Sequence, residues 1–327
     1  WDYLYSQVER LEGKEQQKAI GILINQAGGV CRLHHSLSQM VIDTIKDLVL
    51  KPYVDTKKIL EKIISFLHHH GGELPEEYRQ QWEKLRDDLT GYDFSSFMKR
   101  YVAMDVFEDK FDHAGNQVDQ AQPKIEELAD QAIKDKSLIE NELHWLVTEK
   151  AVNGYRFGYA LGKRDEDFFL WPVLYARQVE EGRDSNVFFL SGYLRSMHEK
   201  NPEEWEKQLD IISNNEITAS LVPELTWRSG MTDRAAQRIL SLAKTGMVSY
   251  ESFAMFGYGS VIKGLSEVIF QNWIDYLLNI EKHEAVIIAL DLYRFYYVQA
   301  GKDCSRTLPE ETTLRLLTHP MLFVIFE

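Results

Sequence analysis

The chain has 327 residues, of which 44% are hydrophobic and 27% charged, and this composition excludes a disordered chain, a collagen-like chain and a disulfide scaffold. Its formal net charge of −14 repels a phosphate backbone, and no run of lysine and arginine forms a basic patch. Nucleic acid is therefore disfavoured as a partner. The length fits two compact domains or one elongated repeat domain.

Apolar residues recur every three or four positions along most of the chain, as they do on one face of a helix. The clearest stretches are residues 37–48, 59–67, 125–133, 262–277 and 285–296. Residues 187–193 can be read as a strand but fit a buried helix better. We predict an all-α fold in which stacked helical hairpins form an irregular α-solenoid of the TPR or HEAT kind. The alternative is a compact all-α domain.

Local signals predict where several of these helices begin and end. The predicted N-caps are Asp55 and Thr232, and the predicted ends are Gly71, Gly246 and Gly301. Three prolines, at positions 75, 202 and 309, are each followed by two glutamates. Proline at the first helical position loses no hydrogen bond, and the glutamates favour the positive end of the helix dipole. We therefore predict three further helix starts there.

Residues 112–122 are polar and suggest a division into subregions 1–111 and 123–327, and residues 213–220 suggest a second loop. Between Asp105 and Lys150 there are 12 acidic and 5 basic residues, a net charge of −7. This segment is interpreted as a solvated, charge-rich connection; the alternative is a docking surface for a basic partner.

Only two cysteines are present, Cys31 and Cys304, far apart in the sequence. They fit a reducing compartment rather than a disulfide framework or a zinc site. No glycosylation sequon, signal peptide or bilayer-spanning run occurs, so we predict a cytoplasmic protein that uses no membrane. The chain begins at Trp1 and stops within an apolar run, and we therefore expect a fragment of a longer polypeptide that has flanking domains.

Three clusters invite chemical hypotheses. The first is His68-His69-His70, but consecutive side chains on a helix point about 100° apart and cannot converge on one metal ion. The second, residues 257–266, is rich in glycine but lacks the lysine of a phosphate-binding loop, and we predict a tight turn between helices. The third is Asp165-Glu166-Asp167. Paired carboxylates can bind Mg²⁺ or carry out acid–base chemistry, but acids before an apolar run are also typical of the first turn of a helix. We therefore predict no catalytic, cofactor-binding or metal-binding residue.

Aromatic residues and arginines anchor many protein interfaces, although in a helical array they also fill wide gaps between helices. We assign Trp145, Trp171 and Trp273 to the core. Trp227, Arg228 and Arg294 are the candidate partner-binding residues.

Five short segments resemble the helical-repeat region of large bacterial multidomain proteins, among them antiviral STAND-type NTPases. They are Trp145-Leu146-Val147, Gly158-Tyr159-Ala160-Leu161-Gly162, Gly192-Tyr193-Leu194, Leu221-Val222-Pro223-Glu224-Leu225 and Leu316-Leu317-Thr318-His319-Pro320. They span a little over half of the chain. The resemblance implies that the repeats recognise a phage protein, while a separate domain carries the ATPase or effector chemistry. It transfers no binding residue, because the recognition surfaces of that family vary.

The sequence therefore favours a non-catalytic, protein-binding module that acts as the sensor or scaffold part of a bacterial antiviral defence protein and needs no cofactor. The alternative is an all-α, metal-dependent hydrolase whose first candidate residues are Asp165, Glu166 and Asp167.

Overall fold

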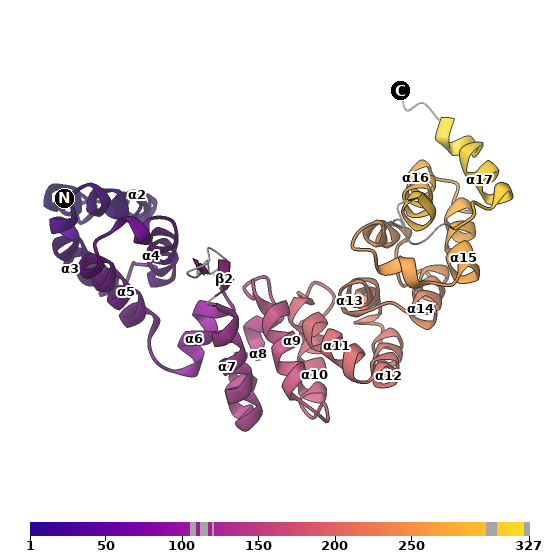
Figure 1. Cartoon of the computed structure of the whole chain (residues 1–327), viewed down its shortest axis with the longest axis horizontal. Coiled ribbons are helices and arrows are strands. Elements are labelled where there is room, and N and C mark those ends of the chain that lie inside the picture. The colour runs from indigo at the N-terminus through magenta and orange to yellow at the C-terminus, as the bar shows by residue number, and fades with distance from the viewer. Residues whose placement is uncertain (105–108, 112–116, 120, 299–305, 324–327) are drawn as a thin grey trace. The chain divides into compact units, whose positions relative to one another are not determined.

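The computed structural model describes residues 1–104, 109–111, 117–119, 121–298 and 306–323. Within this part of the chain nearly all regular structure is helical (Figure 1), so the predicted all-α fold of helices packed on their chain neighbours is confirmed. The described strands form one short antiparallel pair, β1 (Asp109–Phe111) and β2 (Gln117–Asp119). The pair overlaps the polar segment that we expected to be a loop.

The chain divides into two compact units. Unit 1 comprises residues 1–138 and 150–153, and unit 2 comprises residues 139–149 and 154–327. The division runs through α8 (Lys136–Leu146) and lies later in the chain than residues 112–122, where the sequence suggested a break. The physical reason is that α7 (Ala121–Lys134), which follows the strand pair, packs against α6 (Phe94–Tyr101), which precedes it. The strand pair therefore lies inside unit 1.

Unit 1 begins with five helices around one apolar core, which is formed by residues between Val8 and Leu85. Its helices and 3₁₀ turns are α1 (Asp2–Val8), α2 (Gly13–Leu33), η1 (His35–Leu37), α3 (Ser38–Val49), α4 (Thr56–His70), η2 (Gly71–Glu73), α5 (Glu76–Thr90), α6 (Phe94–Tyr101) and α7 (Ala121–Lys134). The predicted helix face of residues 59–67 supplies Ile59 and Ile63 to this core. Cys31 is fully buried in it, and burial raises the pKa of its thiol, while Cys304 lies outside the described residues.

Unit 2 contains most of the remaining helices. They are α9 (Gly154–Arg164), α10 (Trp171–Glu181), α11 (Phe188–Lys200), α12 (Pro202–Ser213), η3 (Ala219–Leu221), α13 (Val222–Ser229), α14 (Asp233–Lys244), η4 (Tyr250–Gly257), η5 (Val261–Gly264), α15 (Glu267–Leu278), α16 (His283–Tyr293), η6 (Arg294–Val298), α17 (Glu310–Leu317) and η7 (Pro320–Phe323). Residues 188–200 are helical, which confirms the helix preferred over a strand there.

The helices of unit 2 pack side by side in two rows. One row runs α9, α11, α13, and η4 then lies between α13 and α16 (Figure 1). A second row runs α12, α14, α15 and on to α16. The three tryptophans assigned to the core are buried: Trp145 and Trp171 are 6% and 5% exposed, and Trp273 is fully buried.

Glycines bring α9 and α11 into backbone contact. A Cβ atom added to Gly158 would lie 2.0 Å from the carbonyl oxygen of Phe189, and one added to Gly192 would lie 2.0 Å from that of Tyr155. No side chain fits at either position, so only glycine permits this approach. The segments around Gly158 and Gly192 are therefore first of all packing elements.

Most of the predicted helix starts and ends are confirmed. The side chains of Asp55 and Thr232 accept hydrogen bonds from the backbone amides of residues 58 and 235. Pro202 is the first residue of α12, as expected. The placement of Pro75 and Pro309 at the first helical position was wrong by one residue, because both are N-caps. Gly301 lies outside the described residues.

Candidate functional site

Trp227 and Arg228 lie in the last turn of α13 and are both half-buried. Pro223 stands in the first turn of this helix, where its missing amide hydrogen costs nothing. The two side chains are therefore carried by a regular helix rather than by a loop. Tryptophan and arginine that stay partly exposed on a rigid element are frequent anchors of protein interfaces.

Three contacts fix Arg228 in place. Its Nε donates a hydrogen bond of 2.8 Å to Glu224 Oε1. Its guanidinium carbon lies 4.0 Å from the ring centroid of Phe188, a cation–π contact. Its backbone carbonyl oxygen accepts a hydrogen bond of 3.1 Å from the hydroxyl of Tyr155 on α9. The guanidinium is thus held in one orientation before any partner binds, which lowers the entropy cost of binding.

Trp227 connects α13 to the loop that follows η4. Its indole Nε1 donates a hydrogen bond of 3.3 Å to the carbonyl oxygen of Tyr258, whose side chain is 71% exposed. The next two residues are left-handed, with φ of 76° at Gly259 and 62° at Ser260. A non-glycine residue in this conformation costs about 1 kcal/mol or more. The predicted turn between helices is confirmed here, and it presents an aromatic side chain to solvent.

Arg294 is the first residue of η6, a π-helical turn at the end of α16. Its side chain is exposed and pairs with that of Asp291 at 3.4 Å, one turn earlier. π-helical turns are rare and frequently occur at functional sites, because the extra residue per turn redirects the side chains. In η6, Arg294 is exposed and Phe295 half-buried, while Tyr296 and Tyr297 are buried.

A cavity of about 110 Å³ lies between η4, the loop after it and the C-terminal end of α16. It is lined by Ala254, Gly257, Tyr258, Ile288, Asp291, Leu292, Arg294 and Phe295. Polar and apolar atoms contribute about equally to this lining, and the two charged residues come from α16 and η6.

The structure thus brings together the three residues that the sequence singled out. Trp227 donates a hydrogen bond to the backbone carbonyl of Tyr258, and Tyr258 and Arg294 line the same cavity. We call Phe188, Trp227, Arg228, Tyr258 and Arg294, with the cavity, the Trp227–Arg294 surface. Sequence reasoning missed Tyr258. The signal that could have found it is an aromatic residue between two glycines, at positions 257 and 259.

The carboxylates of Asp165, Glu166 and Asp167 do not converge. They follow the end of α9 rather than starting a helix, so the expectation of acids in a first helical turn was wrong. Asp165 is fully buried, while Glu166 and Asp167 are exposed. The Asp165 carboxylate accepts hydrogen bonds from the amides of residues 169 and 170, at 3.0 and 2.9 Å, and from the hydroxyl of Tyr193. The carboxylate oxygens of Asp165 are therefore used to hold the loop between α9 and α10. The cluster gives no support to the hydrolase hypothesis.

A separate polar cluster lies on α9 and α11. Glu199 accepts hydrogen bonds from the hydroxyl of Tyr159 at 2.8 Å and from Arg195 Nε at 2.8 Å, and it pairs with Lys163 at 2.7 Å. Partial burial raises the pKa of this carboxyl, but the hydrogen bonds from Lys163, Tyr159 and Arg195 outweigh that effect and lower the pKa to about 2. Glu199 is therefore fully ionised at neutral pH.

The three histidines form the last turn of α4, in unit 1. His70 Nδ1 lies 3.1 Å from Glu73 Oε1 and 3.5 Å from Arg32 Nη1. His69 is exposed, and its ring packs edge to face against that of His68. Across the described residues, no group of three or more metal-ligating side chains lies close enough to hold an ion.

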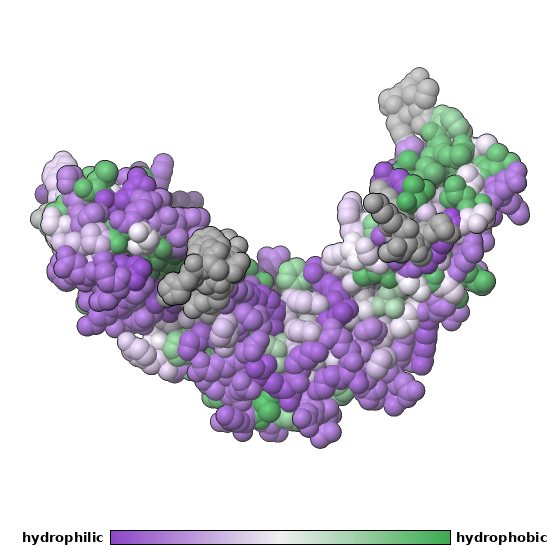
Figure 2. Space-filling view, viewed as in Figure 1, coloured by the Kyte–Doolittle hydropathy of each residue, from purple (hydrophilic) through white to green (hydrophobic). Residues whose placement is uncertain are grey.

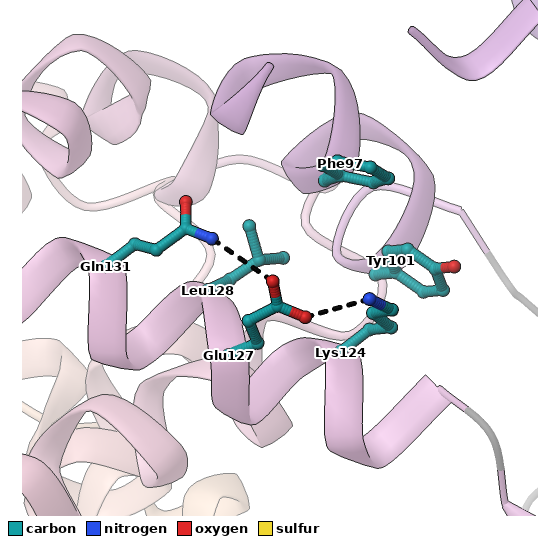
Figure 3. Close-up of a pocket in the computed structure, with 6 residues that line it drawn as sticks. All are labelled: Phe97, Tyr101, Lys124, Glu127, Leu128 and Gln131. Atoms are coloured by element: carbon teal, nitrogen blue, oxygen red, sulfur yellow. Dashed lines mark hydrogen bonds and ion pairs between the residues drawn. The ribbon is translucent and has the colours of Figure 1, made fainter. Parts of the chain in front are cut away.

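Unit 1 has a small pocket between α6 and α7 (Figure 3). Its volume is about 10 Å³, the space of a single water molecule. Figure 3 shows that its polar side chains bond one another: Glu127 accepts from Lys124 at 2.8 Å and from Gln131 at 3.5 Å. The stacked rings of Phe97 and Tyr101 lie on the opposite side. This pocket is too small for a ligand.

Comparison of the chain with protein-family models, with curated proteins and with solved structures gives no match. Among the helices in the part of the chain that the structure describes, none has the length and apolar character needed to cross a bilayer.

Proposed function

We propose that this chain is a non-catalytic module that binds another protein through the Trp227–Arg294 surface. The observation that supports the proposal is the composition of that surface. An exposed tyrosine and one arginine line a small cavity, and a tryptophan that bonds the tyrosine backbone stands beside a second arginine. Interfaces are enriched in these residue types, and truncating one central anchor often costs about 2 kcal/mol or more of binding free energy.

The surface is also built on rigid elements. Arg228 and Trp227 are held by α13, and their contacts reach α9 and the loop after η4. Such preorganisation favours affinity, because little side-chain freedom is lost on binding. Figure 2 shows a largely hydrophilic face over α9 to α12.

For the identity of the partner we extend the resemblance to bacterial antiviral repeat regions. We propose that the partner is a phage protein and that the module acts as a sensor or scaffold in a bacterial defence protein. It would pass the binding energy to flanking domains of the same chain. We also propose a cytoplasmic location, which the two widely spaced cysteines and the lack of a glycosylation sequon support.

Site-specific crosslinking tests the proposal. A photo-reactive phenylalanine analogue replaces Tyr258 in one variant and Tyr92 in the control; these tyrosines are 71% and 76% exposed. Both variants are expressed in bacteria with and without phage infection and are then irradiated. We expect one discrete protein adduct from position 258 in infected cells and none from position 92.

A second variant makes the result specific to the surface. Adding Trp227→Ala to the position-258 variant should abolish the adduct while the protein stays folded by circular dichroism. Adducts of equal yield from positions 258 and 92, or no adduct from either, would contradict the proposal.

A further inference from the structure

The cavity of the Trp227–Arg294 surface has the size of one side chain. An engineered apolar cavity of about 150 Å³ holds a benzene ring. The cavity here measures about 110 Å³, which matches a branched aliphatic side chain of four carbon atoms, such as that of leucine. Its apolar walls are Ala254, Ile288, Leu292 and Phe295.

Two cations and one carboxylate lie at or next to the cavity, in a chain whose net charge is −14. The side chain of Arg294 is 63% exposed at the rim, and Lys263 Nζ lies 5.1 Å from the ring centroid of Phe295, which lines the cavity. Asp291 also lines the cavity and pairs with Arg294 at 3.4 Å. Arginine has five N–H donors, so this single pair leaves donors for a second carboxylate.

The π-helical turn explains why charge and apolar surface meet at this point. A regular helix would continue the α16 pattern, whereas η6 begins directly at Arg294. The turn places Arg294 and Phe295 together on the cavity and keeps Tyr296 and Tyr297 in the core. Tyr258, which also lines the cavity, offers an exposed ring against which a bound backbone can pack.

We propose that the cavity receives a bulky aliphatic side chain from a segment of the partner protein, and that Arg294 and Lys263 bind an Asp or Glu next to that side chain in the segment. This inference rests on the proposed function and adds the chemistry of the recognised segment. Arg294 and Lys263 together outnumber Asp291, so an acidic segment is favoured over a basic one, which would meet an excess of like charge.

Selection from a random peptide library tests the inference with the full 327-residue chain as bait. We expect the enriched peptides to share one Leu, Ile or Met with an Asp or Glu within two positions. One enriched peptide is then synthesised, and its dissociation constant is measured by fluorescence anisotropy for the wild-type chain and four variants.

Two variants alter the site and two are matched controls. Ala254→Trp fills the cavity and should weaken binding at least tenfold, while Ser241→Trp adds the same bulk at another exposed helical position, on α14, and should change nothing. Arg294→Glu reverses the rim charge and should weaken binding at least fivefold. Lys207→Glu reverses the charge of a side chain with the same exposure, 64% against 63%, and the same i,i+3 pairing, and should change nothing.

The outcomes separate this inference from the proposed function. Peptide binding that is insensitive to Ala254→Trp overturns the anchor, and enriched peptides without acidic residues overturn the charge preference; both leave the protein-binding role intact. A crosslinked partner at position 258 without any enriched peptide also overturns the inference alone. If neither peptide nor crosslinked partner is found, both proposals fail.

Discussion

Tyr193 on α11 donates a hydrogen bond to the buried carboxylate of Asp165, 28 residues earlier in the chain. The same carboxylate accepts from two backbone amides and so closes the loop between α9 and α10. Within this loop Phe168 is held at φ 54°, a left-handed conformation that an isolated chain seldom adopts. Burial and the adjacent Asp165 raise the pKa of the Tyr193 hydroxyl, so it remains a donor at any physiological pH.

Removing the Tyr193 hydroxyl should destabilise unit 2. A hydrogen bond to a charged group contributes about 1.5–3 kcal/mol, and we expect Tyr193→Phe to lower the free energy of unfolding by that amount. Tyr175→Phe is the control, because its hydroxyl pairs with the neutral Thr218 hydroxyl at 3.1 Å and should cost about 0.5–1.5 kcal/mol. Urea titration followed by tryptophan fluorescence measures both. Equal losses of unfolding free energy in the two variants would show that the bond to Asp165 contributes no more than a bond between neutral hydroxyls.

The contact between α9 and α11 predicts a strong effect of a single methyl group. Gly192→Ala places a Cβ atom 2.0 Å from the carbonyl oxygen of Tyr155, so the helices must separate. We expect a loss of about 3 kcal/mol, at the upper end of overpacking costs. Gly21→Ala, an exposed mid-helix position with no atom within 4 Å, should instead raise the unfolding free energy by up to about 1 kcal/mol. If both variants melt at the wild-type temperature, the packing described here is wrong.

The ion pair between α12 and α14 predicts a difference between single and double variants. Arg238 is 8% exposed and bonds Glu206 Oε2 and Asp210 Oδ1, each at 2.6 Å. Arg238→Ala leaves the buried Glu206 carboxylate without its main partner and should cost about 3–5 kcal/mol. The double variant Arg238→Leu with Glu206→Leu should recover part of that loss, because no charge stays buried. Thermal unfolding by calorimetry compares the two; a double variant less stable than the single one would refute this account.

The free energy of unfolding should depend on pH through the ionisation of Glu199. Its pKa is lowered from 4.5 to about 2 in the folded chain, so its pairs stabilise the fold fully above pH 4.5, and this contribution disappears as the pH falls from 4.5 towards 2. Its side chain is 28% exposed, and screening by solvent limits the effect to less than about 1 kcal/mol. Glu199→Gln should therefore be less stable than wild type at pH 7 and equal to it near pH 2. A difference that grows on acidification would contradict the assignment.

Sequence reasoning located the helices because their signals are local. The caps at Asp55 and Thr232 act on amides only three residues away, and the apolar period of each helix is read within about 15 residues. The wrong placement of Pro75 and Pro309 has the same origin, since proline fits both the N-cap and the first helical position. Periodicity also sufficed to bury Trp273, which is the least exposed of the three core tryptophans.

The candidate site depends on contacts that no local pattern encodes. Trp227 meets the carbonyl of Tyr258 across 31 residues, and Asp165 meets Tyr193 across 28. Residue type was enough to suggest Trp227 and Arg294 as candidates, but the sequence could not predict that they lie on one surface. It likewise offered no sign of the π-helical turn, because apolar residues 285, 288, 289, 292 and 296 fit the period of a regular α-helix.

The glycine contact also has a mechanical consequence. Helices separated by a layer of side chains can slide as those side chains change rotamer, whereas α9 and α11 touch through rigid backbone at Gly158 and Gly192. The two helices should therefore move together as one rigid body. The hydroxyl of Tyr155, in the same helix as Gly158, donates a hydrogen bond to the backbone carbonyl of Arg228. A displacement of α13 by a bound partner would therefore be transmitted to α9 and α11 together, rather than be taken up by local rearrangement of side chains.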